Sequence, residues 1–153
     1  MRLLKSNTRS VSFELTRIER GALVRMLKRY PVVPAGHHRL SRTDIRPEDQ
    51  QLLEEAQEEF RRTHRRKIQN LLRSKTRLKE HESGFIFSLK HDQVDWFLQV
   101  LNDIRIGSWV ALGSPDGPEQ ILAALTIDNV HHYQVMETAG IFQMLLLSAL
   151  KAG

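Results

Sequence analysis

A run of basic side chains in the middle of the chain is the group best suited to bind a charged partner. The run comprises Arg61, Arg62, Arg65, Arg66 and Lys67. Such a cluster can bind nucleic acid, because cationic side chains neutralise phosphates and release their counterions. Reading or stacking on bases needs further groups, and Phe60 is the one aromatic ring close in sequence. We therefore favour a solvated helix face, in which these bases pair with the glutamates that precede them.

Histidines and carboxylates in the last part of the chain could bind a metal ion. The candidates are Asp128, His131, His132 and Glu137. Residues four apart share a helix face, so Asp128 and His132 could hold a divalent cation together. A catalytic zinc site needs three protein ligands at a recognisable spacing, and the sequence offers no such spacing. A metal-dependent hydrolase is therefore a remote alternative, and we expect no metal or other cofactor.

The sequence carries no motif of an enzyme active site. It has no cysteine, which excludes thiolate catalysis and cysteine-bound zinc. A nucleophile elbow, a phosphate-binding loop and a dinucleotide fingerprint are also missing. We therefore expect a protein without catalytic residues.

Polar residues interrupt two otherwise apolar segments. Asn102, Asp103 and Arg105 lie in the run that begins at Trp96, and Glu137 is an isolated acid further on. A buried charge needs a partner, because burying it alone is strongly unfavourable. We predict that Arg105 pairs with Glu137, with Asn102 assisting, in a polar network between two helices. The alternative is that Asp103 and Arg105 simply face water.

Apolar periodicity and cap residues indicate the elements that position these groups. Segment 11–16 alternates apolar and polar residues, as a half-buried strand does. Thr16 and Glu19 form the pattern of a capping box, which predicts a helix that ends before Pro31. The other expected elements are a loop at 31–46, a long helix at 47–81, a strand at 85–90, and helices at 92–112, 119–125 and 127–150. The apolar stripe of the 47–81 helix is interrupted near His64, so the helix could either bend or break there or be continuous.

These elements predict a mainly α protein. We expect a compact helical bundle of about four main helices, with a small two-stranded β ribbon that pairs 11–16 with 85–90. The chain has 153 residues, of which 41% are hydrophobic and 27% charged, and this size and composition suit a single domain, 1–153. The longest strongly apolar run, 141–150, is far shorter than the roughly 20 residues that cross a bilayer. We expect no membrane partner and a cytoplasmic location, which the absence of cysteine also fits.

Charge is distributed unevenly along the chain, whose formal net charge is +5. Residues 1–46 hold 11 Lys and Arg against 3 Asp and Glu, whereas residues 84–153 hold 3 against 7. A basic part of this kind attracts nucleic acid or an acidic protein. It can equally pack against the acidic part of its own chain, and we favour that interpretation.

Four segments of the chain carry a family resemblance. They are Phe13-Glu-Leu…Glu19-Arg20…Leu23, Glu59-Phe-Arg-Arg-Thr63 with Lys75 downstream, Trp96-Phe-Leu-Gln-Val-Leu-Asn-Asp-Ile-Arg105, and Tyr133 to Leu150 including Gln143. Together they resemble an uncharacterised bacterial family of small helical proteins, a domain of unknown function best known from actinobacteria. The third segment is the most specific match, being similar to the family's segment from tryptophan to L-N-D-x-R. The resemblance implies a helical fold and gives prominence to Asn102, Asp103 and Arg105, but it implies no activity, cofactor or catalytic residue.

The resemblance also suggests a cellular process. Family members in actinobacteria tend to be encoded near the adaptor of the Clp protease, which implies a link to protein turnover. This chain departs from the family in its 31–46 loop, rich in basic residues and histidine, and in His131-His132. These departures weaken the case for a partner shared with the family.

A non-catalytic protein–protein interaction or regulatory module, of unknown pathway and with an unknown protein partner, is the function that the sequence favours. A homodimer also fits, because segment 141–150 is apolar on nearly every side. Such a helix is either central to a core or shared with another subunit. The alternative function is nucleic-acid binding through the basic segments 1–46 and 61–79.

Overall fold

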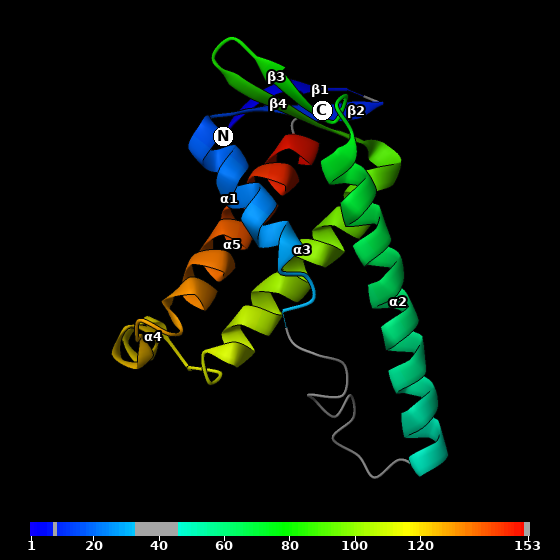
Figure 1. The fold of residues 1–153 in the computed structure, drawn as a ribbon, viewed down its shortest axis with the longest axis vertical. Coiled ribbons are helices and arrows are strands. Elements are labelled where there is room, and N and C mark those ends of the chain that lie inside the picture. The colour runs from blue at the N-terminus through cyan, green and yellow to red at the C-terminus, as the bar shows by residue number, and fades with distance from the viewer. Residues whose placement is uncertain (8, 33–45, 152–153) are drawn as a thin grey trace.

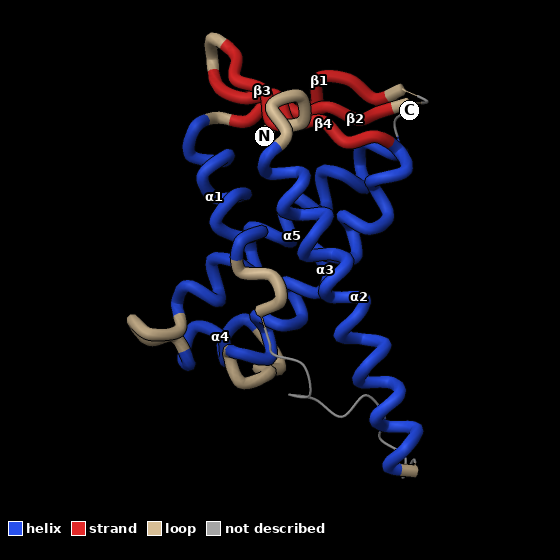
Figure 2. Tube along the Cα trace, turned by 45° about the vertical axis from the view of Figure 1, so that its right-hand side comes forward, coloured by secondary structure: helices blue, strands red, loops and turns tan. Residues whose placement is uncertain are grey.

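The computed structural model describes residues 1–7, 9–32 and 46–151, and these form four strands and five helices (Figure 1). In chain order they are β1 (Arg2–Ser6), β2 (Ser10–Leu15), α1 (Arg17–Lys28), α2 (Pro47–Arg73), β3 (Leu78–His81), β4 (Gly84–Lys90), α3 (His91–Ala111), α4 (Pro118–Ala124) and α5 (Val130–Lys151). The strands form a sheet across one end of the molecule, and the helices extend away from it (Figure 2). Most of the loop expected at 31–46 lies outside the described residues.

The sheet is antiparallel, with the strand order β1-β2-β4-β3. Its central pair joins β2 to β4, with Phe13 directly opposite Phe87, which confirms the predicted pairing of 11–16 with 85–90. Val11, Phe13 and Leu15 are buried while the residues between them are partly exposed, because one face of an antiparallel strand packs on the core and the other faces solvent. The central pair also positions α1 and α3, since these helices follow β2 and β4 directly.

The prediction of a mainly α bundle with a two-stranded ribbon is wrong. The described residues form an α+β fold with a four-stranded sheet, and the two edge strands, β1 and β3, account for the difference. Four of the five β1 residues are exposed, as are three of the four β3 residues. Edge strands often carry charged side chains and need no buried alternating face. Neither segment therefore shows the pattern of a half-buried strand.

Helix α2 ends at Arg73, so the helix predicted for 47–81 is too long. The chain turns at Ser74, whose carbonyl oxygen accepts a hydrogen bond from the Leu78 amide at 3.2 Å. Leu78 then pairs with Phe87 in the sheet. Its apolar side chain fits the spacing of a helical stripe, and the same side chain serves equally well in a strand that borders the core.

Helix α2 is continuous from Pro47 to Arg73, so of the two arrangements that the sequence leaves open, the unbroken helix is the one observed. The His64 side chain is buried on the same face as Ile68 and Leu71. His64 thus continues the buried stripe at the position where no apolar residue occurs.

The other helices lie close to their expected positions. The Thr16 hydroxyl accepts a hydrogen bond from the Glu19 amide at 3.2 Å, and the Glu19 carboxylate accepts one from the Thr16 amide at 2.8 Å. These two bonds complete the predicted capping box at the start of α1. The helices expected at 92–112, 119–125 and 127–150 correspond to α3, α4 and α5, within three residues at each end.

The buried side chains form one continuous core between the sheet and the helices. Helix α3 is central to it, because Phe97, Leu101 and Ile104 are almost completely buried and the helix packs along α5. The rings of Phe87 and Phe97, 5.5 Å apart between centroids, join the sheet to α3. Within the part of the chain that the structure describes, no helix combines the length and apolarity that crossing a membrane requires.

Candidate functional site

The face that α2 turns toward the rest of the protein continues beyond the region where the helix is packed. His64, Ile68 and Leu71 are buried on this face. Nearer the N-terminus of α2, the same face carries Phe60 and Leu53, which are 47% and 43% exposed. The cause is the direction of α2, whose N-terminal half runs away from the other helices (Figures 1 and 2). An apolar stripe at helical spacing is thus left largely uncovered by the described residues.

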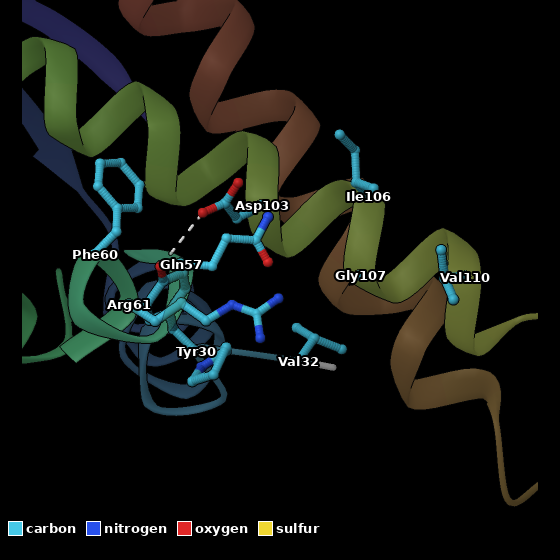
Figure 3. A pocket seen from close by; sticks show the side chains of 10 residues that line it. Tyr30, Val32, Gln57, Phe60, Arg61, Asp103, Ile106, Gly107 and Val110 are labelled. Carbon is cyan, nitrogen blue, oxygen red and sulfur yellow. Dashed lines mark hydrogen bonds between the residues drawn. The ribbon is translucent and has the colours of Figure 1, made fainter. Parts of the chain in front are cut away.

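Helix α3 provides the opposite wall of a groove. Its Ile106 is 52% exposed, and Gly107 and Val110 continue the wall toward the end of the helix. The cavity between the walls measures about 210 Å³. We call it the α2–α3 groove, and its lining consists of Tyr30, Pro31, Val32, Gln57, Phe60, Arg61, Asp103, Ile106, Gly107 and Val110 (Figure 3).

Tyr30, which follows α1, connects the polar side chains at one end of the α2–α3 groove. Its hydroxyl donates a hydrogen bond to Oδ2 of Asp103 on α3 at 3.3 Å (Figure 3). The same hydroxyl lies 3.3 Å from Nδ1 of His64 on α2. A tyrosine hydroxyl has one proton to donate, so the second contact requires a proton on Nδ1 of the imidazole. The Tyr30 phenol thereby connects the end of α1 to both α2 and α3.

Asp103 and His64 both lie where their ionised forms are disfavoured. Burial raises the pKa of the Asp103 carboxyl, and it outweighs the hydrogen bond from Tyr30 and the positive charge of Arg61. Burial also lowers the pKa of His64, with a further contribution from the charge of Lys67. Titratable groups with shifted pKa values beside a cavity mark a candidate functional site.

Arg61 projects into the α2–α3 groove with a donor that the described residues do not satisfy. Its Nη1 atom is buried and has no hydrogen-bond partner in that part of the chain. Buried donors in proteins nearly always have an acceptor. Figure 3 shows the Arg61 side chain reaching into the space between α2, α3 and Val32. Arg61 therefore places a positive charge at the wall of the groove, and its guanidinium is complementary to a carboxylate.

The groove combines an apolar surface with one cationic end, which suits the binding of an amphipathic ligand. Its walls are apolar at Phe60, Ile106 and Val110, and its polar end holds Arg61. Burial and the Asp103 carboxylate raise the pKa of the Tyr30 phenol. The phenol therefore keeps its proton at neutral pH and is a weak nucleophile.

The predicted basic patch divides between two faces of α2. Arg61 faces the groove, and the other members are exposed. These members are Arg62, Arg65, Arg66 and Lys67. Arg62 forms an ion pair with Glu59 at 3.2 Å, and Nζ of Lys67 lies 5.6 Å from the ring centroid of Trp96. Trp96 is itself buried, so its ring does not offer a surface on which a base could stack.

The four residues of the predicted polar network do not come together. Asp103 faces the groove and Asn102 is exposed. Arg105 donates from Nη1 to Oε1 of Gln143 at 2.6 Å. Arg105 and Glu137 line one shallow hollow, but the ion pairs found among the described residues do not include this pair. Arg105 thus links α3 to α5 through Gln143 and not through the predicted partner, Glu137.

The candidate metal ligands are also separate. Helix α5 begins at Val130, so Asp128 precedes the helix and does not share a helical face with His132 as predicted. The rings of His131 and His132 lie 4.0 Å apart between centroids. Burial, followed by the charge of His131, lowers the pKa of His132. Across residues 1–7, 9–32 and 46–151, no group of three or more histidines and carboxylates is placed to hold a metal ion.

Among the described residues, no ion pair joins the basic part of the chain to its acidic part. Those that the described residues form are the Met1 ammonium with Glu19, Arg2 with Glu14, Arg46 with Asp49, and Arg62 with Glu59. Each lies within the first half of the chain. The expected packing of 1–46 against 84–153 does occur, because β2 pairs with β4 and α1 contacts α5, but no ion pair between the described residues of the two parts contributes to it.

Two residues of the site, Tyr30 and His64, are not singled out by any motif in the sequence. The one available signal is spacing, because His64 lies four residues after Phe60 and four before Ile68. That spacing places the imidazole on the buried stripe of the helix. Tyr30 lies beside Pro31 at the end of a helix, where hydrophobic periodicity does not indicate which residues its side chain contacts.

The site is thus defined by the geometry of the chain itself. The resemblance to the actinobacterial family stays a prediction. Comparison of the chain with protein-family models, with curated proteins and with solved structures finds no match.

Proposed function

We propose that this protein is a non-catalytic protein–protein interaction module that binds its partner in the α2–α3 groove. The observation that carries the proposal is the α2 stripe, which is buried at Ile68 and Leu71 but exposed at Phe60 and Leu53. Its exposed part lies across the groove from Ile106. Contiguous exposed apolar side chains bordered by polar groups mark interaction sites on proteins.

The partner is a helical segment with an apolar stripe and one acidic side chain. Two diverging helices form the groove, and their apolar side chains repeat along the helix axes. An amphipathic helix binds in grooves of this kind through apolar residues at positions i, i+3, i+4 and i+7. An acidic side chain would complement Arg61, which lines the groove and forms no ion pair among the described residues.

A pull-down from nuclease-treated lysate of the native host tests the location of the binding surface. The wild-type chain should retain at least one protein reproducibly. Phe60→Asp and Ile106→Asp should each lose that protein, because they place a charge on an apolar wall. Both side chains are half exposed, so the substitutions leave the core intact, which circular dichroism checks.

The matched control is Leu122→Asp, which places the same charge on an exposed apolar residue of α4. This variant should retain the same protein as the wild type. Equal retention by the Phe60→Asp variant would overturn the proposal, and so would the absence of any protein that survives nuclease treatment.

The acidic character of the partner is tested with two adjacent arginines. Arg61→Gln should weaken binding of the purified partner by about tenfold, because a charge-assisted hydrogen bond is lost. Arg62→Gln changes the same charge on the outer face of α2 and should leave the affinity unchanged. Equal effects of the two substitutions would show that Arg61 does not contact the partner.

Nucleic-acid binding through 1–46 and 61–79 is the second candidate function, favoured by the exposure of Arg65, Arg66 and Lys67. It predicts binding to a random-sequence duplex that weakens steeply as salt increases. Reversing these three charges to Glu should abolish that binding, while Phe60→Asp should leave it intact. A chain that does not bind the duplex at low salt would eliminate this candidate.

The proposed cellular location and process of the interaction rest on the sequence alone. A cytoplasmic location fits the absence of cysteine, and the family resemblance links the module to protein turnover. Self-association is a separate interaction, for which α5 offers its own surface.

A further inference from the structure

Helix α5 turns an apolar face away from the core. Its buried face consists of Val135, Ala139, Phe142, Leu146 and Ala149. On the opposite side Ile141, Met144 and Leu147 are 51%, 59% and 43% exposed. Single exposed apolar residues are common on proteins, but three that repeat along one helix form a continuous strip. We call this strip the outer face of α5.

A shallow hollow lies in the outer face of α5. It measures about 220 Å³ and is lined by Arg105, Met136, Glu137, Gly140, Ile141 and Met144. Glycine weakens a helix interior relative to alanine, so a glycine at this position calls for a reason. The fold of the chain supplies none, because a Cβ atom at Gly140 would lie in ordinary contact with Arg105, at 3.7 Å from its Nε atom. The absent side chain instead leaves room for another helix to approach.

Opposite charges border the hollow. Arg105 reaches it from α3 and is held by its hydrogen bond to Gln143, which marks one edge of the outer face. Helical spacing places Glu137 toward the other edge, with Gly140 and Met144 between the two. Among the described residues Glu137 forms no ion pair.

A face with a cation on one edge and an anion on the other is complementary to a copy of itself. A two-fold axis that runs parallel to α5, in front of its outer face, sets the Arg105 edge of each copy opposite the Glu137 edge of the other. The same surface then contacts itself, as an isologous interface requires. The apolar strip then packs against itself, with Gly140 at the point of closest approach.

We infer that the outer face of α5 is a homodimer interface, in which Arg105 pairs with Glu137 of the partner subunit. The interface is separate from the proposed α2–α3 groove, because α5 and α2 flank α3 on opposite sides (Figure 1). A dimer therefore leaves both grooves available, and the failure of either proposal leaves the other standing.

Sedimentation equilibrium of the purified full chain tests self-association. From low to high micromolar concentration, the wild type should shift from the mass of one chain to that of two. Met144→Glu should weaken the dimer by at least about tenfold, because it buries a charge at the centre of the interface. Ile18→Glu, on an exposed position of α1, should leave the dimer unchanged. A wild-type chain that stays monomeric throughout would overturn the inference.

Mixing two charge-reversed variants tests the pairing itself. Arg105→Glu and Glu137→Arg should each self-associate about tenfold more weakly than the wild type, because each homodimer then sets like charges together. An equimolar mixture should form heterodimers, since the mixed pair restores two contacts between opposite charges. Folding of each variant is checked by thermal unfolding. A mixture that associates no better than its separate components would overturn the Arg105–Glu137 contact.

Discussion

Gly84 lies so close to the Leu15 carbonyl oxygen that a Cβ atom added to the glycine would overlap it. The contact lies at the end of the central strand pair, where neither backbone can move without disturbing the register of β2 and β4. We predict that Gly84→Ala lowers the free energy of unfolding by about 1–3 kcal/mol, measured by urea denaturation. Gly117→Ala is the control, because nothing lies within 4 Å of its added Cβ. Similar losses in the two variants would contradict this geometry.

The hydrogen bond between Tyr30 and Asp103 should appear as a coupling energy. Tyr30→Phe, Asp103→Ala and the double variant form a thermodynamic cycle, to be measured by chemical denaturation. The expected coupling is about 0.5–1.5 kcal/mol, the range of a hydrogen bond between side chains. Tyr133→Phe removes a hydroxyl for which the described residues show no hydrogen bond, and its effects should simply add to those of Asp103→Ala. A Tyr30–Asp103 coupling indistinguishable from zero would show that the bond contributes nothing to stability.

His64 should make the protein sensitive to mild acid. Its pKa is lowered in the folded state, chiefly by burial, so the unfolded chain takes up the proton at a higher pH. The stability that this histidine contributes is complete above the usual histidine pKa of about 6.5 and declines as the pH falls through the folded value. Between about pH 7.5 and about pH 5.5, the wild type should therefore lose more free energy of unfolding than His64→Gln. The comparison uses each protein's own change with pH, because the substitution also alters packing at both values. Equal changes in the wild type and the His64→Gln variant would mean that the folded protein does not disfavour protonation of the His64 imidazole.

Phe87 joins the centre of the sheet to α3, and its loss should be costly. Phe87→Ala should lower the free energy of unfolding by about 3–5 kcal/mol, the range for truncating a buried phenylalanine. Ile127 is almost completely exposed, and Ile127→Ala should change the same quantity by less than about 0.5 kcal/mol. Urea denaturation of both variants checks the prediction, which fails if the Phe87 substitution costs no more than the Ile127 one.

The parts of the fold that follow from the sequence are those whose signal is local or strongly apolar. The capping box at Thr16 and Glu19 marks the start of α1, and the alternation of 11–16 marks the centre of the sheet. The edge strands have no such signal. Leu78 fits a helical stripe as well as a strand, and what decides between them is its pairing with Phe87, a contact that local periodicity does not reveal.

The candidate site is harder to predict from the sequence than the fold, because the site depends on the direction in which single side chains point. Arg61 and Arg62 are neighbours in one basic run, yet one enters the α2–α3 groove and the other pairs with Glu59 on the outer face. The sequence marks Asp103 as a polar residue beside the core, but its partner Tyr30 lies far away in sequence. Consecutive residues of a helix point in directions about 100° apart, which separates the two arginines. The tertiary fold, which sets the end of α1 beside α3, brings the tyrosine to the aspartate.

The strand order has a consequence for synthesis on the ribosome. Strand β2 can pair with β1 as soon as both have emerged, but its other neighbour, β4, follows only after α1 and α2 have been translated. During that interval the nascent chain exposes one edge of a strand whose inner side chains are Val11, Phe13 and Leu15. Open edges of this kind recruit strands from other chains. Translation that stops before β4 should therefore yield a product that aggregates or is held by chaperones, whereas the finished chain closes the edge with its own residues.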